Sequence, residues 1–162
     1  MSDMLVRLYD LPEVEEKLTA LAEEGILVRR LQPWELSPLR RFIADHFSEG
    51  WADEASVGLA SRPISVFIAQ DGARMVGFAA YECTARGFFG PMGVDETYRK
   101  RGIGAVLTLA CLHSMREMGY GYAIIGGAGP KDFYAKCCGA TLIEDSEPGI
   151  YAWKKAQYPP KE

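Results

Sequence analysis

The chain has 162 residues, of which 48% are hydrophobic, and its 18 basic and 22 acidic side chains give a net charge of -4 at pH 7. A chain of this size and composition is typical of one globular domain that folds without disulfides or structural metal. Proteins that bind duplex nucleic acid usually carry a basic surface that displaces counterions from phosphates. The acidic balance therefore argues against nucleic acid as a ligand.

The first eleven residues bring Asp3, Arg7 and Asp10 into a short apolar run. A secretory signal needs a continuous apolar segment, which these charges interrupt. No other stretch approaches the roughly 18 to 20 apolar residues that span a bilayer. We therefore expect a cytoplasmic protein without a membrane partner.

The cysteines and histidines do not have the spacing of a metal site. No C-x-x-C pair occurs, and the two histidines, His46 and His113, lie far apart in the chain. Without export, the thiols are expected to be reduced and partly buried. This applies to all four cysteines, which are Cys83, Cys111, Cys137 and Cys138. We expect no bound metal.

Hydrophobic spacing predicts the elements of the first part of the chain. A lead-in helix is expected over residues 12–24, with Asp10 as its N-cap and its apolar side packed on the domain. A strand at 26–31, a helix at 33–47 and a short helix around 51–61 should follow.

Two apolar runs rich in β-forming residues, 64–70 and 75–82, are separated by Asp71-Gly72-Ala73-Arg74. This turn chemistry predicts an antiparallel hairpin. The next run, 87–94, is also strand-like but contains Pro91 between glycines. Because proline cannot donate to a sheet ladder, we expect a bulge there that leaves backbone groups unpaired.

A helix predicted over residues 102–118 is apolar almost all round in its first half, so it should lie deep in the fold. The alternation of strands and helices indicates a mixed sheet with helices on both faces. The remaining predicted elements are a strand at 120–126, a helix at 131–138, strands at 141–144 and 150–154, and a polar tail at 157–162.

The segment 92–107 reads as a strand that runs through a basic turn into the buried helix. Gly102 and Gly104 allow close backbone approach, and a helix N-terminus offers unpaired N–H groups and partial positive charge. The alternative is a solvated basic turn, but the glycines and the helix favour a site for a diphosphate. The P-loop pattern is absent, and Leu107 replaces the third glycine of a dinucleotide fingerprint. The cations nearby are Arg99, Lys100 and Arg101.

The run Arg99-Lys100-Arg101-Gly102-Ile103-Gly104 fits the pattern [QR]-x-x-G-x-[GA], with matching flanks at 93–98, 105–107, 133–136 and 139–140. In these segments the chain resembles the GNAT superfamily of N-acetyltransferases. The resemblance implies an α/β fold of GNAT type: a mixed, mostly antiparallel central sheet, splayed between strands 4 and 5, with helices on both faces. It places the GNAT domain at 26–155, after a lead-in helix in 1–25 and before a polar tail at 156–162.

The resemblance also implies acetyl-CoA as co-substrate, with its pantetheine between the splayed strands. Many members carry an asparagine where this chain has Gly127, so pantetheine should rely more on backbone groups. The residues implied for cofactor binding are Met92, Gly93, Val94, Arg99, Lys100, Arg101, Gly102, Ile103, Gly104 and Ala105.

Acyl transfer from a thioester needs a neutral amine, a site for the oxyanion and a proton for the leaving thiolate. Backbone N–H groups near Gly93 and Val94, beside the expected bulge, are candidates for the oxyanion site. Segment 87–92 has no ionisable side chain, which leaves Glu82 as candidate base; the alternative is an ordinary strand-end carboxylate. Tyr134 is the candidate acid, and the alternative is a core aromatic.

The resulting hypothesis is an N-acetyltransferase that moves acetyl from acetyl-CoA to a primary amine of a small molecule by direct attack in a ternary complex. The resemblance places the acceptor between residues 46–55 and 145–150. It leaves a homodimer open, for which residues 11–21 offer an apolar face. The alternatives are a non-catalytic CoA-binding sensor, a transferase of longer acyl groups, and a transferase that acts on a protein amine.

Overall fold

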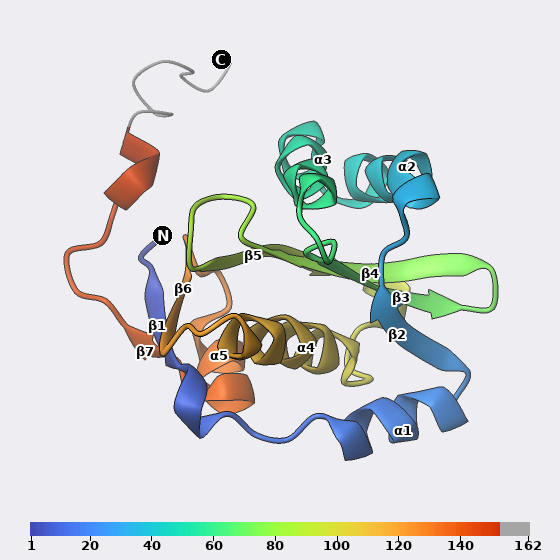
Figure 1. Ribbon diagram of the computed structural model, residues 1–162, viewed down its shortest axis with the longest axis horizontal. Helices are drawn as coiled ribbons and strands as arrows, with labels where there is room; N and C mark the ends of the chain where they lie inside the picture. The colour runs from blue at the N-terminus through green and yellow to red at the C-terminus, as the bar shows by residue number, and fades with distance from the viewer. Residues whose placement is uncertain (153–162) are drawn as a thin grey trace.

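The computed structural model describes residues 1–152 and shows one mixed sheet with helices on both faces (Figure 1). The sheet order is β2-β3-β4-β5-β6-β1-β7. The strands are β1 (Met4–Arg7), β2 (Ile26–Arg30), β3 (Val66–Asp71), β4 (Arg74–Tyr81), β5 (Phe88–Val94), β6 (Tyr122–Ile125) and β7 (Thr141–Leu142). The helices are α1 (Glu15–Glu23), α2 (Leu36–His46), α3 (Glu49–Ser56), α4 (Ile103–Glu117) and α5 (Lys131–Cys138).

All neighbouring strands pair antiparallel except β5 and β6, which are parallel. Helices α2 and α3 cover one face, while α4, α5 and α1 lie on the other (Figure 1). Each face has its own apolar cluster, one around Phe78 and Ile43 and the other around Leu107 and Leu109. The predicted fold class, a mostly antiparallel mixed sheet covered on both sides, is confirmed.

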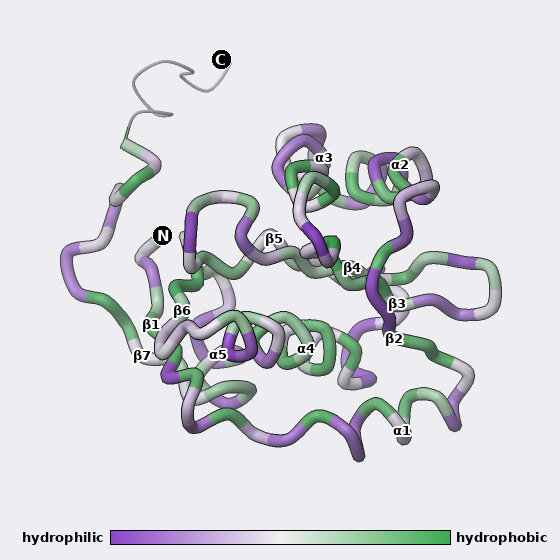
Figure 2. Tube along the Cα trace, viewed as in Figure 1, coloured by the Kyte–Doolittle hydropathy of each residue, from purple (hydrophilic) through white to green (hydrophobic). Residues whose placement is uncertain are grey.

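Helix α4 is the centre of the larger cluster, and Figure 2 shows it as a largely hydrophobic segment beneath the sheet. Ile103, Leu107, Leu109, Leu112 and Met115 are all fully buried, which accounts for the apolar residues around its circumference. Burial of each such side chain contributes roughly 1.5–3 kcal/mol of transfer free energy. The core therefore holds the N-terminus of α4 in a fixed position relative to the sheet.

Strands β5 and β6 pair over a short length, through the first two residues of β5 and the last two of β6. Within the described chain they pair only through Phe88 with Ile124 and Phe89 with Ile125. The Gly90–Pro91 peptide bond is cis, and the pairing of β5 with β4 shifts register at the same level. The bulge predicted from Pro91 is confirmed, and β5 beyond it has no partner on the β6 side.

Strand β1 was not predicted from the sequence. It lies between β6 and β7 and pairs antiparallel with both. Met4 and Val6 point into the core while Arg7 is exposed, which is the period-two pattern of a strand with one buried face. Its charged neighbours and short length hide this alternation.

The lead-in helix exists as α1, but its N-cap is Val14 rather than the predicted Asp10, which ends a 3-10 turn (Leu8–Asp10). Val14 and Leu21 are buried in the larger cluster, against which Leu11 and Leu18 also pack. The apolar face at 11–21 therefore packs on the core of the same chain, and the possible homodimer stays a prediction.

The predicted strand at 150–154 is wrong for its described part, because Gly149–Tyr151 forms a 3-10 turn. Residues 153–154 and the polar tails predicted at 156–162 and 157–162 lie outside the described residues. All four cysteines are free thiols. None of the helices in the described residues has the length and apolarity needed to cross a membrane.

Candidate active site

The turn before α4 presents backbone N–H groups to solvent. Lys100 and Gly102 both adopt left-handed conformations, with φ of +65° and +84°, and Gly102 is the N-cap of the helix. A Cβ atom at Gly102 would meet nothing within 4 Å, so the space above the helix N-terminus is open. The first N–H groups of a helix have no intrahelical partners and attract anions. The predicted phosphate-binding turn therefore has suitable geometry.

The three cations of this turn have different partners. The Arg101 guanidinium lies 3.6 Å from Glu24 and 5.4 Å from the ring centre of Tyr98. Arg99 donates from Nε to the Val94 carbonyl oxygen at 3.2 Å. Lys100 has no ion pair within residues 1–152, so its ammonium is free to approach an anion.

Gly104, in the first turn of α4, faces the space between β5 and α5. A Cβ atom there would lie 3.5 Å from the Phe133 ring, 3.6 Å from Val94 and 3.8 Å from Met92. These are ordinary van der Waals distances, so a Cβ atom at Gly104 would not clash with its neighbours. Three segments that are distant in sequence thus converge where β5 has left β6.

Tyr134 lies beside this opening and is only 6% exposed. Its ring packs edge-on against Phe133 at 5.1 Å and Phe89 at 6.0 Å between centroids. No group within residues 1–152 hydrogen-bonds its hydroxyl, yet the oxygen is not fully shut off from solvent. Burial raises the pKa of Tyr134 well above that of an ordinary phenol, so the hydroxyl stays protonated at neutral pH.

The backbone of β5 directs alternate residues toward the opening. The Asp95 N–H donates to the Val76 carbonyl oxygen on β4 at 2.8 Å. By the alternation of an antiparallel pair, Gly93 also faces β4, whereas Met92 and Val94 face away from it. The sequence proposed both Gly93 and Val94 as N–H donors; the strand geometry leaves Val94 in the position to serve.

A comparison with protein-family models shows what this part of the chain is similar to. Residues 62–137, which include the hairpin, β5, α4 and most of α5, match the model of the acetyltransferase (GNAT) domain. This segment, just under half of the chain, is therefore similar to a GNAT acetyltransferase domain. No curated protein sequence matches it.

Solved structures agree on the fold. The glucosamine N-acetyltransferase region of a fungal multi-domain GH3 β-N-acetylglucosaminidase superposes with a TM-score of 0.70 at 17% identity, over 88% of this chain and 19% of that one. A GCN5-related N-acetyltransferase from Sphaerobacter thermophilus gives 0.69 at 19% identity, over 88% and 48%. One from Kribbella flavida gives 0.60 at 18%, over 87% and 53%. This chain thus spans from about a fifth to about half the length of these neighbours.

Glu82 lies at the opposite end of β5 from the turn before α4. Its backbone N–H donates to the Phe88 carbonyl at 2.9 Å, and the seven-residue strand from Phe88 to Val94 is roughly 20 Å long. Its carboxylate accepts hydrogen bonds from the Gly87 N–H and, at 3.1 Å, from the Tyr120 hydroxyl. These bonds close the loop that leads into β5, and the predicted role as base stays a prediction.

On the α2–α3 side of the sheet, an aromatic group lies within the segment 46–55 that the resemblance places at the acceptor. Phe47 lies directly over Gly93, where a Cβ atom would collide with its ring. Trp51 stacks on Phe47 at 5.4 Å and is 38% exposed. A glycine in a strand often marks close approach by another group, which is the signal that could have identified this contact.

Tyr151 marks the other side of the predicted acceptor cleft. Its hydroxyl lies against Gly126 at the end of β6, and Phe88 of β5 is also near. Burial, followed by the nearby charges of Glu54 and Asp3, raises the pKa of Tyr151 to about 12. The segment that carries it and α3 stand on either side of the loop into β5 (Figure 1).

Proposed function

We propose that the protein is an acetyl-CoA-dependent N-acetyltransferase that acetylates the primary amine of a small molecule. The observation that carries this proposal is the side of β5 beyond Phe89 that has no strand partner toward β6 within residues 1–152. This part of β5 comes close to Gly104 and Phe133 beside the exposed N-terminus of α4. A candidate site for a diphosphate thus lies next to a strand whose backbone can pair with a ligand. That combination suits a ligand with a charged head and a long thin arm, and the match to the GNAT domain supports CoA as that ligand.

In this proposal the pyrophosphate binds the N–H groups at the start of α4. Gly102, Ile103, Gly104 and Ala105 supply donors, and Lys100 adds charge. The pantetheine arm passes between β5 and α5, where Met92 and Val94 present their backbone groups. The Val94 N–H is the candidate donor to the carbonyl oxygen as it gains negative charge.

The transfer itself forms one C–N bond and breaks one C–S bond. The neutral amine attacks the thioester carbon, the tetrahedral intermediate collapses, and the thiolate leaves with its electron pair. Tyr134 donates its proton to that thiolate. The length of β5 separates Glu82 from Val94, so the proton of the amine passes along a chain of waters, with Glu82 as its candidate acceptor. Burial raises the pKa of a phenol and of a thiol alike, so proton donation between them stays nearly balanced inside the site.

The acceptor is proposed to be a cationic amine in its resting form. It would enter between Trp51 and Tyr151, where the half-buried Glu54 contributes negative charge. Thr84 donates a hydrogen bond to the Glu54 carboxylate and so orients it. An exposed indole face together with a carboxylate attracts an alkylammonium group.

One specific observation favours a second candidate, a CoA-binding sensor without catalysis. Strand β5 has no ionisable side chain, and the Glu82 carboxylate is already held by two donors. A protein of this kind would keep the phosphate site and lose turnover.

Two measurements on the full chain test the proposal. Calorimetry with CoA and with acetyl-CoA should give saturable binding at one site. Thiol release from acetyl-CoA in the presence of a panel of amines, which includes amino sugars, polyamines and amino acids, should show turnover with at least one. Binding without turnover would favour the sensor, and absence of binding would contradict both candidates. Competition by longer acyl-CoAs would show whether the gap near Phe88 and Phe89 accepts a larger acyl group.

A further inference from the structure

The position of β1 brings Asp3 to a junction that no sequence pattern indicated. Met4 is opposite Ile125 of β6 and Leu142 of β7, so the residue before it lies one step beyond both strands. On one side that step is the loop 126–130, which leads into α5. On the other side it is the segment 143–149, which borders the predicted acceptor cleft.

Toward the first loop, the polar atoms of Ser2 and Asp3 accept hydrogen bonds from two successive amides. The Gly127 N–H donates to Asp3 Oδ1 at 2.8 Å, and the Ala128 N–H donates to the Ser2 carbonyl oxygen at 2.9 Å. Gly127 has a φ of +56°, a left-handed conformation that turns the chain. The Asp3 carboxylate therefore binds the loop at the residue where it turns. Both amides are therefore engaged by the protein and are not available as donors to a cofactor.

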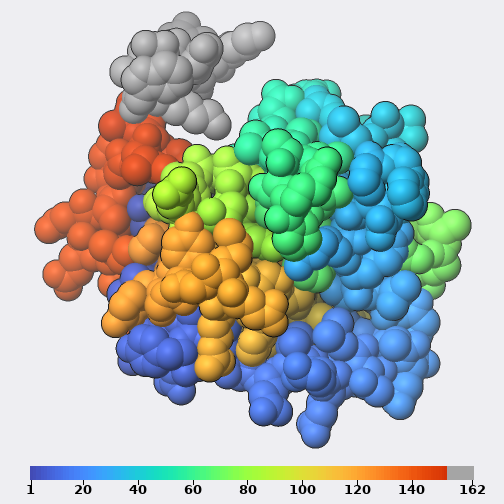
Figure 3. Space-filling view, viewed as in Figure 1, coloured from blue at the N-terminus to red at the C-terminus, as the bar shows by residue number. Residues whose placement is uncertain are grey.

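Toward the second loop, Asp3 uses its own backbone. Its carbonyl oxygen accepts from the Ile143 N–H at 2.9 Å, and its N–H donates to the Ser146 hydroxyl oxygen at 2.8 Å. The same hydroxyl donates to the Ile143 carbonyl oxygen at 2.6 Å. Asp3 is only 7% exposed, and Figure 3 shows dark blue N-terminal atoms between the red C-terminal segment and the orange region that contains β6.

From these contacts we infer that Asp3 is a positioning residue for the acyl-CoA site, acting through the loop 126–130. This loop passes directly into α5, which carries Phe133 and Tyr134. The Gly127 amide is partly buried, and leaving it without an acceptor is unfavourable, so loss of the carboxylate should let Gly127 leave its position and shift the start of α5. The inference rests on the proposed function, because it assigns Asp3 to the site where CoA is proposed to bind.

The experiment compares three variants of the full chain. Asp3→Ala removes the acceptor for Gly127, whereas Asp3→Asn keeps an oxygen at the same place. Val6→Ala is the matched control, because Val6 is a fully buried residue of the same strand that pairs with Ala123 of β6 and whose side chain forms no hydrogen bond. For each variant, calorimetry gives the Kd for CoA, steady-state kinetics gives KM and kcat, and thermal unfolding gives Tm.

We expect Asp3→Ala to raise the Kd for CoA and the KM for acetyl-CoA by roughly fivefold to twentyfold, the loss of one charged hydrogen bond. Asp3→Asn should stay within about threefold of the wild type, because the amide oxygen still accepts. Val6→Ala should lower Tm at least as much as Asp3→Ala and leave CoA binding unchanged. Unchanged Kd in Asp3→Ala, equal weakening in Val6→Ala, or equal loss in Asp3→Asn would each overturn the inference.

Hydrogen exchange separates this inference from the proposed function, because it needs no ligand. The amides of Gly127 and Ala128 should exchange on the order of tenfold faster in Asp3→Ala than in the wild type, and at nearly the wild-type rate in Asp3→Asn. A wild type that fails to bind CoA would contradict the proposed function alone. Unchanged exchange at Gly127 in Asp3→Ala would contradict the positioning role of Asp3 whatever the ligand is.

Discussion

The two halves of the sheet differ in how completely their polar groups are paired. In β2, β3 and β4 the strands pair along their lengths, with Ile26 opposite Asp71 and Val66 opposite Ala80. At the junction of β5 and β6 the pairing ends after Phe89. Apart from the outer edge of β2, the strands of the first half are therefore paired with one another, whereas the second half leaves one side of β5 beyond Phe89 without a strand partner toward β6 within residues 1–152, near the N-terminus of α4.

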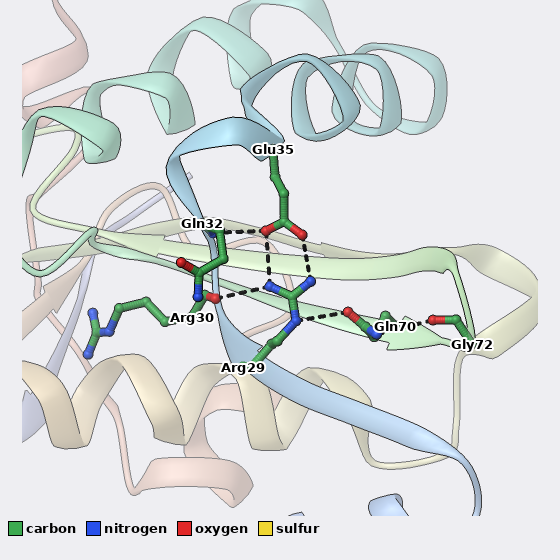
Figure 4. Close-up of polar contacts among 6 residues, drawn as sticks. All are labelled: Arg29, Arg30, Gln32, Glu35, Gln70 and Gly72. Carbon is green, nitrogen blue, oxygen red and sulfur yellow. Dashed lines mark hydrogen bonds and ion pairs between the residues drawn. The ribbon is translucent and has the colours of Figure 1, made fainter.

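Side-chain contacts show the same contrast. In the first half, Arg29 donates to both carboxylate oxygens of Glu35, at 2.5 and 3.0 Å, and to the Gln70 side chain at 2.9 Å (Figure 4). At the junction, the Tyr134 hydroxyl has no hydrogen-bond partner within residues 1–152. Polar groups with hydrogen-bond partners stabilise the fold. Polar groups without partners mark a place where a ligand can provide the missing hydrogen bonds.

The largest effect is expected from Tyr134→Phe. This change keeps the ring and its packing on Phe89 and Phe133, so the fold should survive. If the hydroxyl protonates the leaving thiolate, kcat should fall roughly tenfold to a thousandfold while the Kd for acetyl-CoA is nearly unchanged. Steady-state kinetics and calorimetry measure the two effects separately.

The matched control is Tyr122→Phe, an exposed tyrosine on β6, which should leave both constants unchanged. Because burial raises the pKa of Tyr134, its protonated form should persist beyond pH 10, and wild-type kcat should show no alkaline loss from this group below that pH. Normal turnover of Tyr134→Phe, with chemistry as the slow step, would make Tyr134 a core aromatic.

Glu82→Gln tests the other candidate in the reaction. The amide oxygen can still accept from the Gly87 N–H, and the amide nitrogen can donate to the Tyr120 hydroxyl oxygen, so the loop into β5 should remain closed. Loss of a general base is expected to lower kcat on the order of tenfold to a hundredfold. The readout is kcat at saturating acetyl-CoA and amine. A wild-type kcat in this variant would assign Glu82 to loop closure alone.

Gly104→Val addresses the opening between β5 and α5. A Cβ atom fits there at ordinary contact distances, so the helix should still form, but the added methyl groups would occupy the gap beside Phe133. We expect the Kd for CoA to rise by about tenfold or more. Gly121→Ala is the control, because a Cβ atom at Gly121 meets nothing within 4 Å. Unchanged CoA affinity would place the phosphate site elsewhere.

The features that could be predicted from sequence are those that depend on interactions between residues close together in the chain. The hairpin at 71–74, the buried helix α4 and the bulge at Pro91 depend on neighbouring residues, and each was predicted. Strand β1 was not, because its partners lie more than a hundred residues away. The Asp3 contact with Gly127 spans 124 positions, and no local pattern can indicate it.

The smallest effect is expected in the fully paired half, from Glu35→Gln. Here the ion pair with Arg29 fastens the turn before α2 to the sheet, and the Gln32 N–H donates to the same carboxylate at 2.8 Å. Both side chains are partly exposed, so solvent weakens the pair, and its loss should lower the free energy of unfolding by about 1 kcal/mol. Activity and CoA affinity should not change, because no part of the proposed site contacts this pair.

The contribution of this ion pair to the free energy of unfolding should depend on pH, and the direction follows from the pKa of Glu35. The Arg29 hydrogen bond holds the pKa of Glu35 below its ordinary value of 4.5, so the folded state favours the ionised carboxylate. The stabilisation is complete at pH values above the unfolded pKa and is lost as pH falls through the lower folded pKa. Urea unfolding of wild type and Glu35→Gln should therefore differ most near neutral pH and converge in acid. A constant difference across that range would mean that Glu35 stabilises the turn by packing and hydrogen bonding alone, since glutamine does not titrate.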